Sequence, residues 1–312
     1  MLGRHAIGYE RGAHRLPKGE PMSLELAERL AASQTWLDGL SDRLQPIVRN
    51  TVARTGRQTA DLLDGVWLGA PLHPALSDVP VGALTAAVAL DAVGVATQSR
   101  AVERHADAAL AVSVASALGA AVTGLSDWRY MRGEKRRLAA AHGLLNAIGT
   151  AFNATSLGLR LADRRRAGQV SSALGFAVAG MAAHLGGELS FGMGVRVNQA
   201  QAGRGPSEFR AVLDESELEG TAMREVEVEG EAVLVTRSTS GELCAIANTC
   251  SHFGGPLAEG EREGDVVVCP WHGSRFDVCT GKVRGGPAVF PQPRFESRVR
   301  DGKIEVRRSP AG

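Results

Sequence analysis

The sequence predicts a multidomain protein in which an α-helical membrane bundle of four transmembrane helices is followed by an all-β domain. Three observations predict it: long uncharged stretches in the middle of the chain, a polar linker after Arg196, and a change from helical to alternating hydrophobic periodicity beyond the linker. We therefore expect five segments: a disordered N-terminus (1–22), amphipathic helices (23–65), a four-helix membrane domain (66–196), a linker (197–207) and a β domain (208–308).

The N-terminal segment 1–22 has neither an apolar core nor a cleavage site, so no secretory signal is expected. From Ser23, which can cap a helix, leucines recur at helical intervals. Pro46 is expected to interrupt this pattern. Residues 23–65 are predicted to lie on the membrane surface or to pack on the bundle.

Three stretches of 19, 22 and 21 residues carry no Asp, Glu, Lys or Arg: 108–126, 138–159 and 167–187. A fourth, 79–98, carries only Asp91, and Asp78 is expected to cap its helix. A membrane helix needs about 20 apolar residues. Small residues at four-residue spacing, such as Gly175 and Ala183, favour close helix packing in lipid over the alternative of a soluble, alanine-rich bundle.

Basic residues orient this bundle. Ten Lys and Arg residues flank the helices on the side of the termini and six lie on the other side. The positive-inside rule then predicts a multi-pass cell-membrane protein with both termini and the β domain in the cytoplasm.

Residues 208–308 predict a small antiparallel β domain. Val226 and Val228 alternate with glutamates, and Asp301-Gly302 is a strong hairpin signal. The overall charge of +1 gives no electrostatic case for a nucleic-acid partner.

Candidate metal ligands lie in two loops of the β domain, Cys250-Ser251-His252 and Cys269-Pro270-Trp271-His272. A zinc site is one alternative, but zinc loops usually pair like with like. Here each loop mixes one Cys with one His, which suits a [2Fe–2S] cluster with two cysteines on one iron and two histidines on the other.

The stretches CSHFGGPLAEG and VVCPWHGSRFD resemble the bacterial Rieske ferredoxin family over about residues 206–308. This resemblance implies a Rieske [2Fe–2S] cluster with Cys250 and Cys269 on one iron and His252 and His272 on the other. It also implies a cluster-binding subdomain inserted into a β scaffold. In the respiratory pattern a Ser and a Tyr donate hydrogen bonds to cluster sulfurs; Ser274 keeps the first place and Phe276 fills the second.

The respiratory Rieske pattern also has an extra Cys in each loop, and these form a disulfide. Gly255 and Trp271 stand at those places here. Cys244 and Cys279 lie elsewhere and are expected to be small buried thiols rather than a disulfide. A cluster without the disulfide suits a reducing compartment.

The segment WLGAPLHP (67–74) resembles an uncharacterised family of small four-helix membrane proteins, some of which are fused to Rieske domains. The family has His where Ala70 stands, which weakens the case for a metal site at this end. Deeper in the bundle, His142 and His184 lie on polar helix faces. They suggest either a b-type haem or quinone site or plain interhelical hydrogen bonds, and Asp91 is expected to be paired with His or Arg.

The predicted function is a membrane-anchored one-electron carrier. Its partners would be reductase or oxygenase components on the cytoplasmic side. The alternative is a redox-sensing module whose cluster state regulates the bundle or a partner. A ring-hydroxylating enzyme needs a separate iron held by two His and a carboxylate. No His follows His272, so we expect an oxidoreductase component rather than a stand-alone catalyst.

Overall fold

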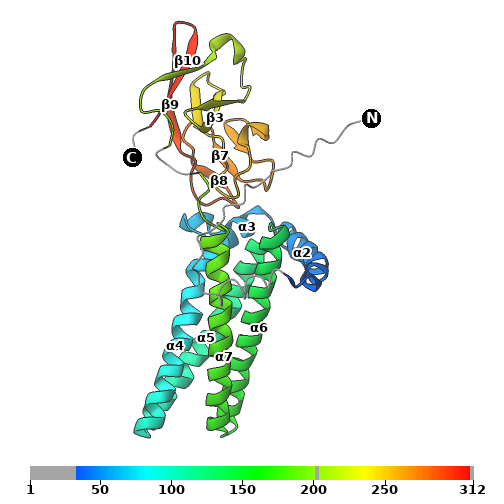
Figure 1. The fold of residues 1–312 in the computed structure, drawn as a ribbon, viewed down its shortest axis with the longest axis vertical. Coiled ribbons are helices and arrows are strands. Elements are labelled where there is room, and N and C mark those ends of the chain that lie inside the picture. The colour runs from blue at the N-terminus through cyan, green and yellow to red at the C-terminus, as the bar shows by residue number, and fades with distance from the viewer. Residues whose placement is uncertain (1–32, 201–203, 310–312) are drawn as a thin grey trace, which may run out of the picture.

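The computed structural model describes residues 33–200 and 204–309, in which a helical part precedes a β-rich part (Figure 1). The predicted segment 1–22 and the start of the predicted amphipathic region lie outside these residues. The helical part begins with α2 (Trp36–Arg54), α3 (Arg57–Asp64) and a short 3-10 turn (Val66–Leu68). Figure 1 shows α2 beside the end of the bundle that is nearer to the β-rich part.

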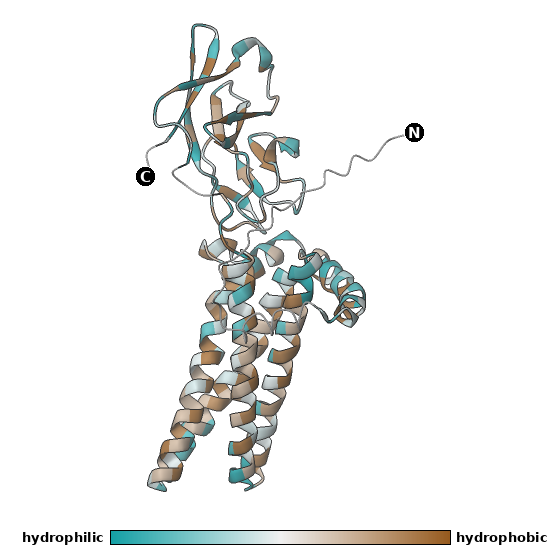
Figure 2. Cartoon of the chain, viewed as in Figure 1, coloured by the Kyte–Doolittle hydropathy of each residue, from teal (hydrophilic) through white to brown (hydrophobic). Residues whose placement is uncertain are grey.

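The bundle consists of α4 (Leu72–Thr97), α5 (Arg100–Trp128), α6 (Gly133–Leu161) and α7 (Arg165–Gly187), continued by a π-helical turn (Glu188–Gly192). Three of the described helices are long and apolar enough to cross a membrane: Leu72–Thr97, Arg100–Trp128 and Arg165–Gly192. Helix α6 is as long as α5, with 29 residues, but is not among these three. Figure 2 shows hydrophobic residues along much of the bundle. The predicted fold class, a membrane-capable helical region before a β domain, is confirmed.

Two predicted helix boundaries are wrong. Helix α4 begins at Leu72, so Asp78 lies inside it and does not cap it. Helix α2 continues through Pro46, and the chain breaks at Gly56, which has a φ of 86°. A proline removes one backbone donor and can stay inside a helix, whereas a φ this positive favours glycine and ends the helical path.

Small and polar residues join the helices of the bundle. A Cβ atom on Gly149 of α6 would lie 3.2 Å from the carbonyl oxygen of Gly175 in α7, so the backbones approach closely there. Near the other end of the bundle Arg160 pairs with Asp91 at 2.5 Å and with Asp107 at 2.8 Å. The expectation that Asp91 has a basic partner is therefore confirmed.

The β-rich part contains two antiparallel sheets. The larger has the strand order β1 (Arg210–Asp214), β10 (Lys303–Arg308), β9 (Arg294–Arg300), β4 (Leu243–Ala247), β3 (Glu231–Arg237), β2 (Arg224–Val228). The smaller has the order β5 (Glu261–Glu263), β6 (Val266–Val268), β7 (Arg275–Asp277), β8 (Val283–Gly285). Asp301 and Gly302, with φ values of 51° and 73°, form the predicted turn between β9 and β10.

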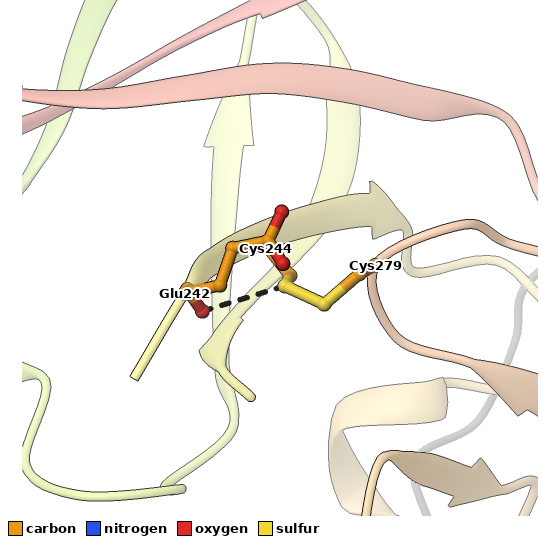
Figure 3. Close-up of side chains that lie close together, drawn as sticks. All are labelled: Glu242, Cys244 and Cys279. Atoms are coloured by element: carbon orange, nitrogen blue, oxygen red, sulfur yellow. Dashed lines mark hydrogen bonds between the residues drawn. A yellow bond between two sulfur atoms is a disulfide. The ribbon is translucent and has the colours of Figure 1, made fainter. Parts of the chain in front are cut away.

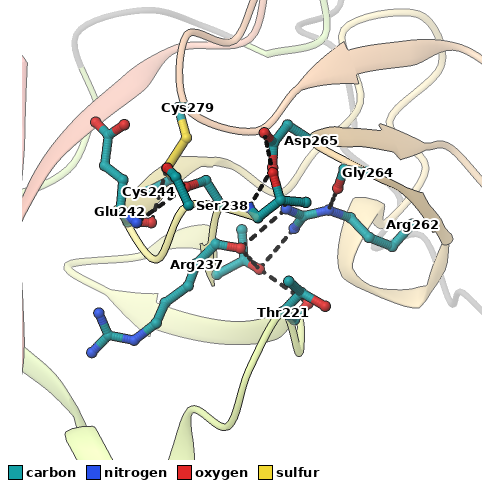
Figure 4. Close-up of polar contacts among 12 residues, drawn as sticks. Thr221, Arg237, Ser238, Glu242, Cys244, Arg262, Gly264, Asp265 and Cys279 are labelled. Carbon is teal, nitrogen blue, oxygen red and sulfur yellow. Dashed lines mark hydrogen bonds and ion pairs between the residues drawn. A yellow bond between two sulfur atoms is a disulfide. The ribbon is translucent and has the colours of Figure 1, made fainter.

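Arg262 of β5 links the two sheets (Figure 4). Its guanidinium donates to the Thr236 hydroxyl at 2.8 Å and to the Arg237 carbonyl at 3.0 Å, both in β3. It also pairs with Asp265 at 3.2 Å. The small sheet therefore has a fixed position against the large one, and the loops that leave β4 and β6 start from connected strands.

Buried charges join the helical and β-rich parts. Asp64 of α3 pairs with Arg129, after α5, at 2.7 Å, and both side chains are 2% exposed. Arg196 donates to the carbonyl oxygens of Asp64 at 2.5 Å and Pro287 at 2.9 Å. Its guanidinium also lies 3.2 Å from the Asp127 carboxylate. This network holds the loop around Pro287 against the end of the bundle.

Candidate metal centre

Two loops with the same backbone geometry bring the four predicted ligands together. One follows β4 and the other follows β6. In each loop the Cys N–H donates to the carbonyl of the fifth residue after it, and the N–H of the fourth residue donates to the Cys carbonyl. These bonds are Cys250 to Gly255 (2.9 Å), Gly254 to Cys250 (2.8 Å), Cys269 to Ser274 (2.8 Å) and Gly273 to Cys269 (3.0 Å). The fourth residue is a glycine with φ near +80° in both loops (80° and 77°), which other residues rarely adopt.

The two loop cysteines are free, buried and in contact. Cys250 is 1% exposed and Cys269 is 3% exposed. A hydrogen bond between them, aided by burial, raises the pKa of Cys250. The same bond and the N–H groups of Trp271 and His272 lower the pKa of Cys269, against the effect of burial. The Ser274 hydroxyl also hydrogen-bonds the Cys250 sulfur, so Ser274 lies where a donor to cluster sulfur was predicted.

The two loop histidines lie beside these thiols, with ring centres 5.1 Å apart and planes at 88°. Burial, followed by the charge of Arg196, lowers the pKa of His252 far below its usual value. Burial and Arg132 lower the pKa of His272 to about 4. Both imidazoles are therefore neutral near pH 7, as metal ligands must be. The Nδ1 atom of His252 is buried and has no hydrogen-bond partner among residues 33–200 and 204–309.

Two thiols, two neutral imidazoles and an unpartnered buried ring nitrogen fit a soft metal centre. Cys250, Cys269, His252 and His272 would hold a [2Fe–2S] cluster, which supplies reversible one-electron chemistry when bound. The surrounding backbone N–H groups of Trp271 and His272 would then hydrogen-bond sulfur. The assignment of these residues as ligands remains a prediction.

Gly255 and Trp271 occupy adjacent positions across the two loops. A Cβ atom on Gly255 would lie 2.9 Å from the Cys269 sulfur and 3.0 Å from the Trp271 ring. The position therefore needs glycine for close approach. The places that carry a disulfide in the respiratory pattern are filled here by this contact between a glycine and a tryptophan.

Cys244 and Cys279 form a disulfide (Figure 3), so the prediction of free thiols is wrong. The bond links β4 to the turn after β7, and Glu242 lies beside it. The two cysteines are separated by 35 residues, and their pairing depends on how the two sheets pack. The two cysteines of the cluster loops are free, but this disulfide elsewhere in the domain counts against the argument for a reducing compartment.

An aromatic group from the bundle covers the histidine side of the site. The ring of Tyr130, in the turn between α5 and α6, lies 5.1 Å from that of His272 and 5.8 Å from that of His252. The guanidinium of Arg129 lies 4.4 Å from the centre of the Tyr130 ring. Sequence reasoning missed Tyr130, because nothing in the local pattern shows that this turn meets a loop more than 120 residues later.

The other predicted cofactor residues, His142 and His184, have different surroundings. Among the described residues, the ring that lies against His142 is that of His73. His184 has a buried Nε2 atom without a hydrogen-bond partner. The structure therefore brings His142 together with a histidine that the sequence argument had not paired with it.

Comparison with known proteins finds two families in the chain. Residues 208–296 match the Rieske [2Fe-2S] domain, and residues 69–199 match a family described as a predicted membrane protein (DUF2231). Ferredoxin CarAc of Metapseudomonas resinovorans is 35% identical over 91 residues, which are 29% of this chain and 85% of that protein. The ferredoxin component of the naphthalene 1,2-dioxygenase system of Pseudomonas putida is 41% identical over 89 residues, 28% of this chain and 84% of the relative.

Apoptosis-inducing factor 3 of Homo sapiens is 35% identical over 99 residues, 32% of this chain, but the match spans only 16% of that protein. The likeness in these three relatives is confined to about a third of the chain. The two loops with their Cys and His side chains, together with the near-complete coverage of small ferredoxins, show that the chain belongs to the Rieske [2Fe-2S] domain family, with a DUF2231 membrane domain in front of the Rieske domain.

Proposed function

We propose that this protein is a membrane-anchored Rieske electron-transfer protein that carries one electron at a time between a donor and an acceptor. The observation that carries the proposal is the convergence of two buried thiols and two neutral imidazoles, one of which has an unpartnered buried nitrogen. The names of the ferredoxin components among the relatives support the same role.

The membrane anchor rests on the three apolar helices and on the match to a membrane-protein family. We propose that the Rieske domain lies in the cytoplasm, because the loops on its side of the bundle carry ten of the sixteen flanking basic residues. The disulfide between Cys244 and Cys279 argues in the other direction, since disulfides are rare in the cytoplasm. The activity of alkaline phosphatase fused after Gly312 would decide between a cytoplasmic and an exported Rieske domain.

The partners that fit are soluble reductase or oxygenase components. Tyr130 and Phe253 cover His252, which is 5% exposed. Trp271, next to His272, is 54% exposed. An exposed aromatic side chain is typical of a protein-docking surface. We therefore propose that a partner docks over Trp271 and reaches the site from the side that the bundle leaves open.

The test uses the full-length protein purified in detergent. We expect two irons and two acid-labile sulfides per chain, and a paramagnetic Rieske signal after reduction with dithionite. Ferric cytochrome c should then abolish this signal while it is itself reduced. Cys250→Ser should abolish the signal, because a hydroxyl is a poor ligand for a soft metal. A protein with one zinc and no sulfide would refute the proposal.

One observation favours the alternative function, a redox sensor. Tyr130 of the helical part packs against His252 and His272, so a change at the site could reach the bundle. A sensor would change its binding of a partner with the oxidation state of the protein, without net electron flow. Stoichiometric reoxidation by a soluble acceptor would favour the carrier. Reduced protein that holds its electron in the presence of acceptors, while binding of a partner changes, would favour the sensor.

A further inference from the structure

Two histidines face each other between the two helical hairpins of the bundle, α4–α5 and α6–α7. The ring centres of His73 (α4) and His142 (α6) are 6.3 Å apart, and the ring planes are at 85°. The Nδ1 atom of His73 lies 2.8 Å from the carbonyl oxygen of Ala120 in α5. The Nδ1 atom of His142 lies 2.8 Å from the carbonyl oxygen of Ala182 in α7. A carbonyl only accepts, so each Nδ1 carries the proton and each Nε2 carries the lone pair.

Glycines make room for both rings. A Cβ atom on Gly124 would lie 2.9 Å from Cε1 of His73, and one on Gly186 would lie 3.0 Å from Cε1 of His142. Each glycine is four residues after the alanine whose carbonyl accepts from that ring. In each hairpin the second helix, α5 or α7, thus supplies both an acceptor and a space for the ring that its partner helix carries.

A second feature is shared by α4 and α6, the helices that carry His73 and His142. Four residues after each histidine, a polar side chain donates to the histidine's own carbonyl oxygen: Ser77 to His73 at 2.8 Å and Asn146 to His142 at 3.0 Å. The two hairpins therefore repeat one device of histidine, acceptor, glycine and polar residue. Such a repeat suits a single ligand held between two similar halves.

The spacing of the rings fits one metal ion between them. Bonds of about 2.0 to 2.1 Å from a metal to each imidazole nitrogen place the ring centres roughly 6 Å apart. The Asn146 amide also lies 3.1 Å from Nε2 of His142, where only its N–H₂ group can donate. This bond agrees with a lone pair on Nε2 of His142. A metal ion that binds Nε2 would replace the Asn146 N–H as its partner.

A metal ion here would find only two protein ligands. Among the described residues, the one group of three His, Cys, Asp or Glu side chains close enough to share an ion is Glu242, Cys244 and Cys279, in the β-rich part. A zinc ion with four ligands does not suit such a pair. A porphyrin supplies four equatorial nitrogens and leaves two opposite positions, which histidines fill in haem proteins.

The pair also lies close to the Rieske domain. Pro71, two residues before His73, lines the same small pocket as His252 and Arg196. Along α5, Ala120 and Gly124 fall between two apolar clusters that include Leu110 and Trp128. Both rings are partly buried.

We propose that His73 and His142 are the two axial ligands of a haem bound between the hairpins, on the side of the bundle next to the Rieske domain. Bound there, the haem iron would exchange single electrons between its ferric and ferrous forms without any transfer of atoms. This assignment goes beyond electron carriage by the Rieske domain alone, and it replaces the pairing of His142 with His184.

The test is haem content, measured on full-length protein that is produced with added 5-aminolaevulinate and purified in detergent. We expect about one haem per chain by the pyridine haemochrome assay. His73→Ala and His142→Ala should each lower the haem content at least about tenfold. The paramagnetic signal of the Rieske domain, recorded on the same samples, reports whether each variant is folded. His105→Ala and His184→Ala are the matched controls and should keep their haem.

If His142→Ala loses both haem and the Rieske signal, the variant has not folded, and His142→Gly is tested in its place. Free imidazole should restore haem binding to that variant if the lost group is an iron ligand, and it should not if the residue only supports packing. Wild-type protein with a complete cluster but no haem, and with no uptake of added haemin, would overturn the proposal. That result would leave the electron-carrier proposal untouched.

Discussion

At the scale of single residues, the hydroxyl group of Ser274 is a side-chain donor that the structure places on Cys250, a predicted cluster ligand. Ser274 is fully buried, hydrogen-bonds the Cys250 sulfur and accepts the N–H of Ala288 at 3.1 Å. A donor to sulfur stabilises the reduced, more negative cluster and so raises its potential. The bond is therefore expected to tune the potential rather than to hold the metal.

Ser274→Ala should lower the reduction potential by roughly 40 mV, since a hydrogen bond contributes about 1 kcal/mol and one electron is transferred. Protein-film voltammetry measures the change. Ser297→Ala is the control, because the Ser297 hydroxyl donates to the Leu243 carbonyl within the larger sheet and not to Cys250 or Cys269. An unchanged potential in Ser274→Ala would show that its hydroxyl does not act on the cluster.

Phe276 is a second residue at which the potential can be tested. Its ring is fully buried in the apolar cluster that contains Cys250 and Cys269. Phe276→Tyr should raise the potential by a similar roughly 40 mV if the new hydroxyl reaches a cysteine sulfur. The wild-type potential should lie toward the low end of the range from about −150 to +300 mV. A wild-type value near the top of that range would contradict this argument, and Phe295→Tyr in the other apolar cluster is the control.

At the scale of secondary-structure elements, the buried Asp64–Arg129 pair attaches α3 to the end of α5. Asp64→Ala leaves the Arg129 guanidinium buried without its counter-ion, which typically costs about 3 to 5 kcal/mol. We expect a clear fall in the thermal unfolding midpoint in detergent. Glu208→Ala, which removes a partner of Arg210 in a pair whose side chains are 79% and 53% exposed, should change it little. Equal effects of the two substitutions would show that the Asp64 pair does not stabilise the junction.

The disulfide between Cys244 and Cys279 covalently links β4 of the larger sheet to the turn after β7 of the smaller sheet. Closing a loop of this length stabilises a folded domain by typically about 2 to 4 kcal/mol. Cys244→Ala with Cys279→Ala should therefore lower the unfolding midpoint of the Rieske domain in oxidising buffer. In buffer with a strong reductant, the difference from the wild type should disappear. Wild-type protein in which both thiols react with an alkylating reagent without prior reduction would disprove the bond.

At the scale of the whole molecule, the sequence predicted the features that depend on local order. The composition of 108–126 and 167–187 predicted membrane-capable helices, and Asp301-Gly302 predicted a hairpin. The spacing of Cys and His predicted that the candidate metal ligands lie in two loops. Each of these signals depends on a few neighbouring residues, so one sequence is enough to detect it.

The features that the sequence did not predict depend on how elements meet. His142 lies against His73 because of how α4 and α6 are rotated in the bundle. Tyr130 reaches the two loop histidines because the helical part contacts the β-rich part there. Cys244 meets Cys279 because of the packing of β4 against the turn after β7. Hydrophobic periodicity tells which face of an element is apolar, but not which other element covers that face.

The orientation of the whole molecule in the membrane determines on which side the Rieske domain lies. Figure 1 shows the turn between α6 and α7 at the end of the bundle away from the Rieske domain. The positive-inside rule predicts that this turn is exported and that the Rieske domain is not. Alkaline phosphatase, which is active only after export, should be active when fused after Asp163 and inactive when fused after Gly312. The reverse pattern would place the Rieske domain outside the cytoplasm. The Cys244–Cys279 disulfide would then form in an oxidising compartment. The redox partners of the Rieske domain would in that case be exported proteins rather than cytoplasmic reductases.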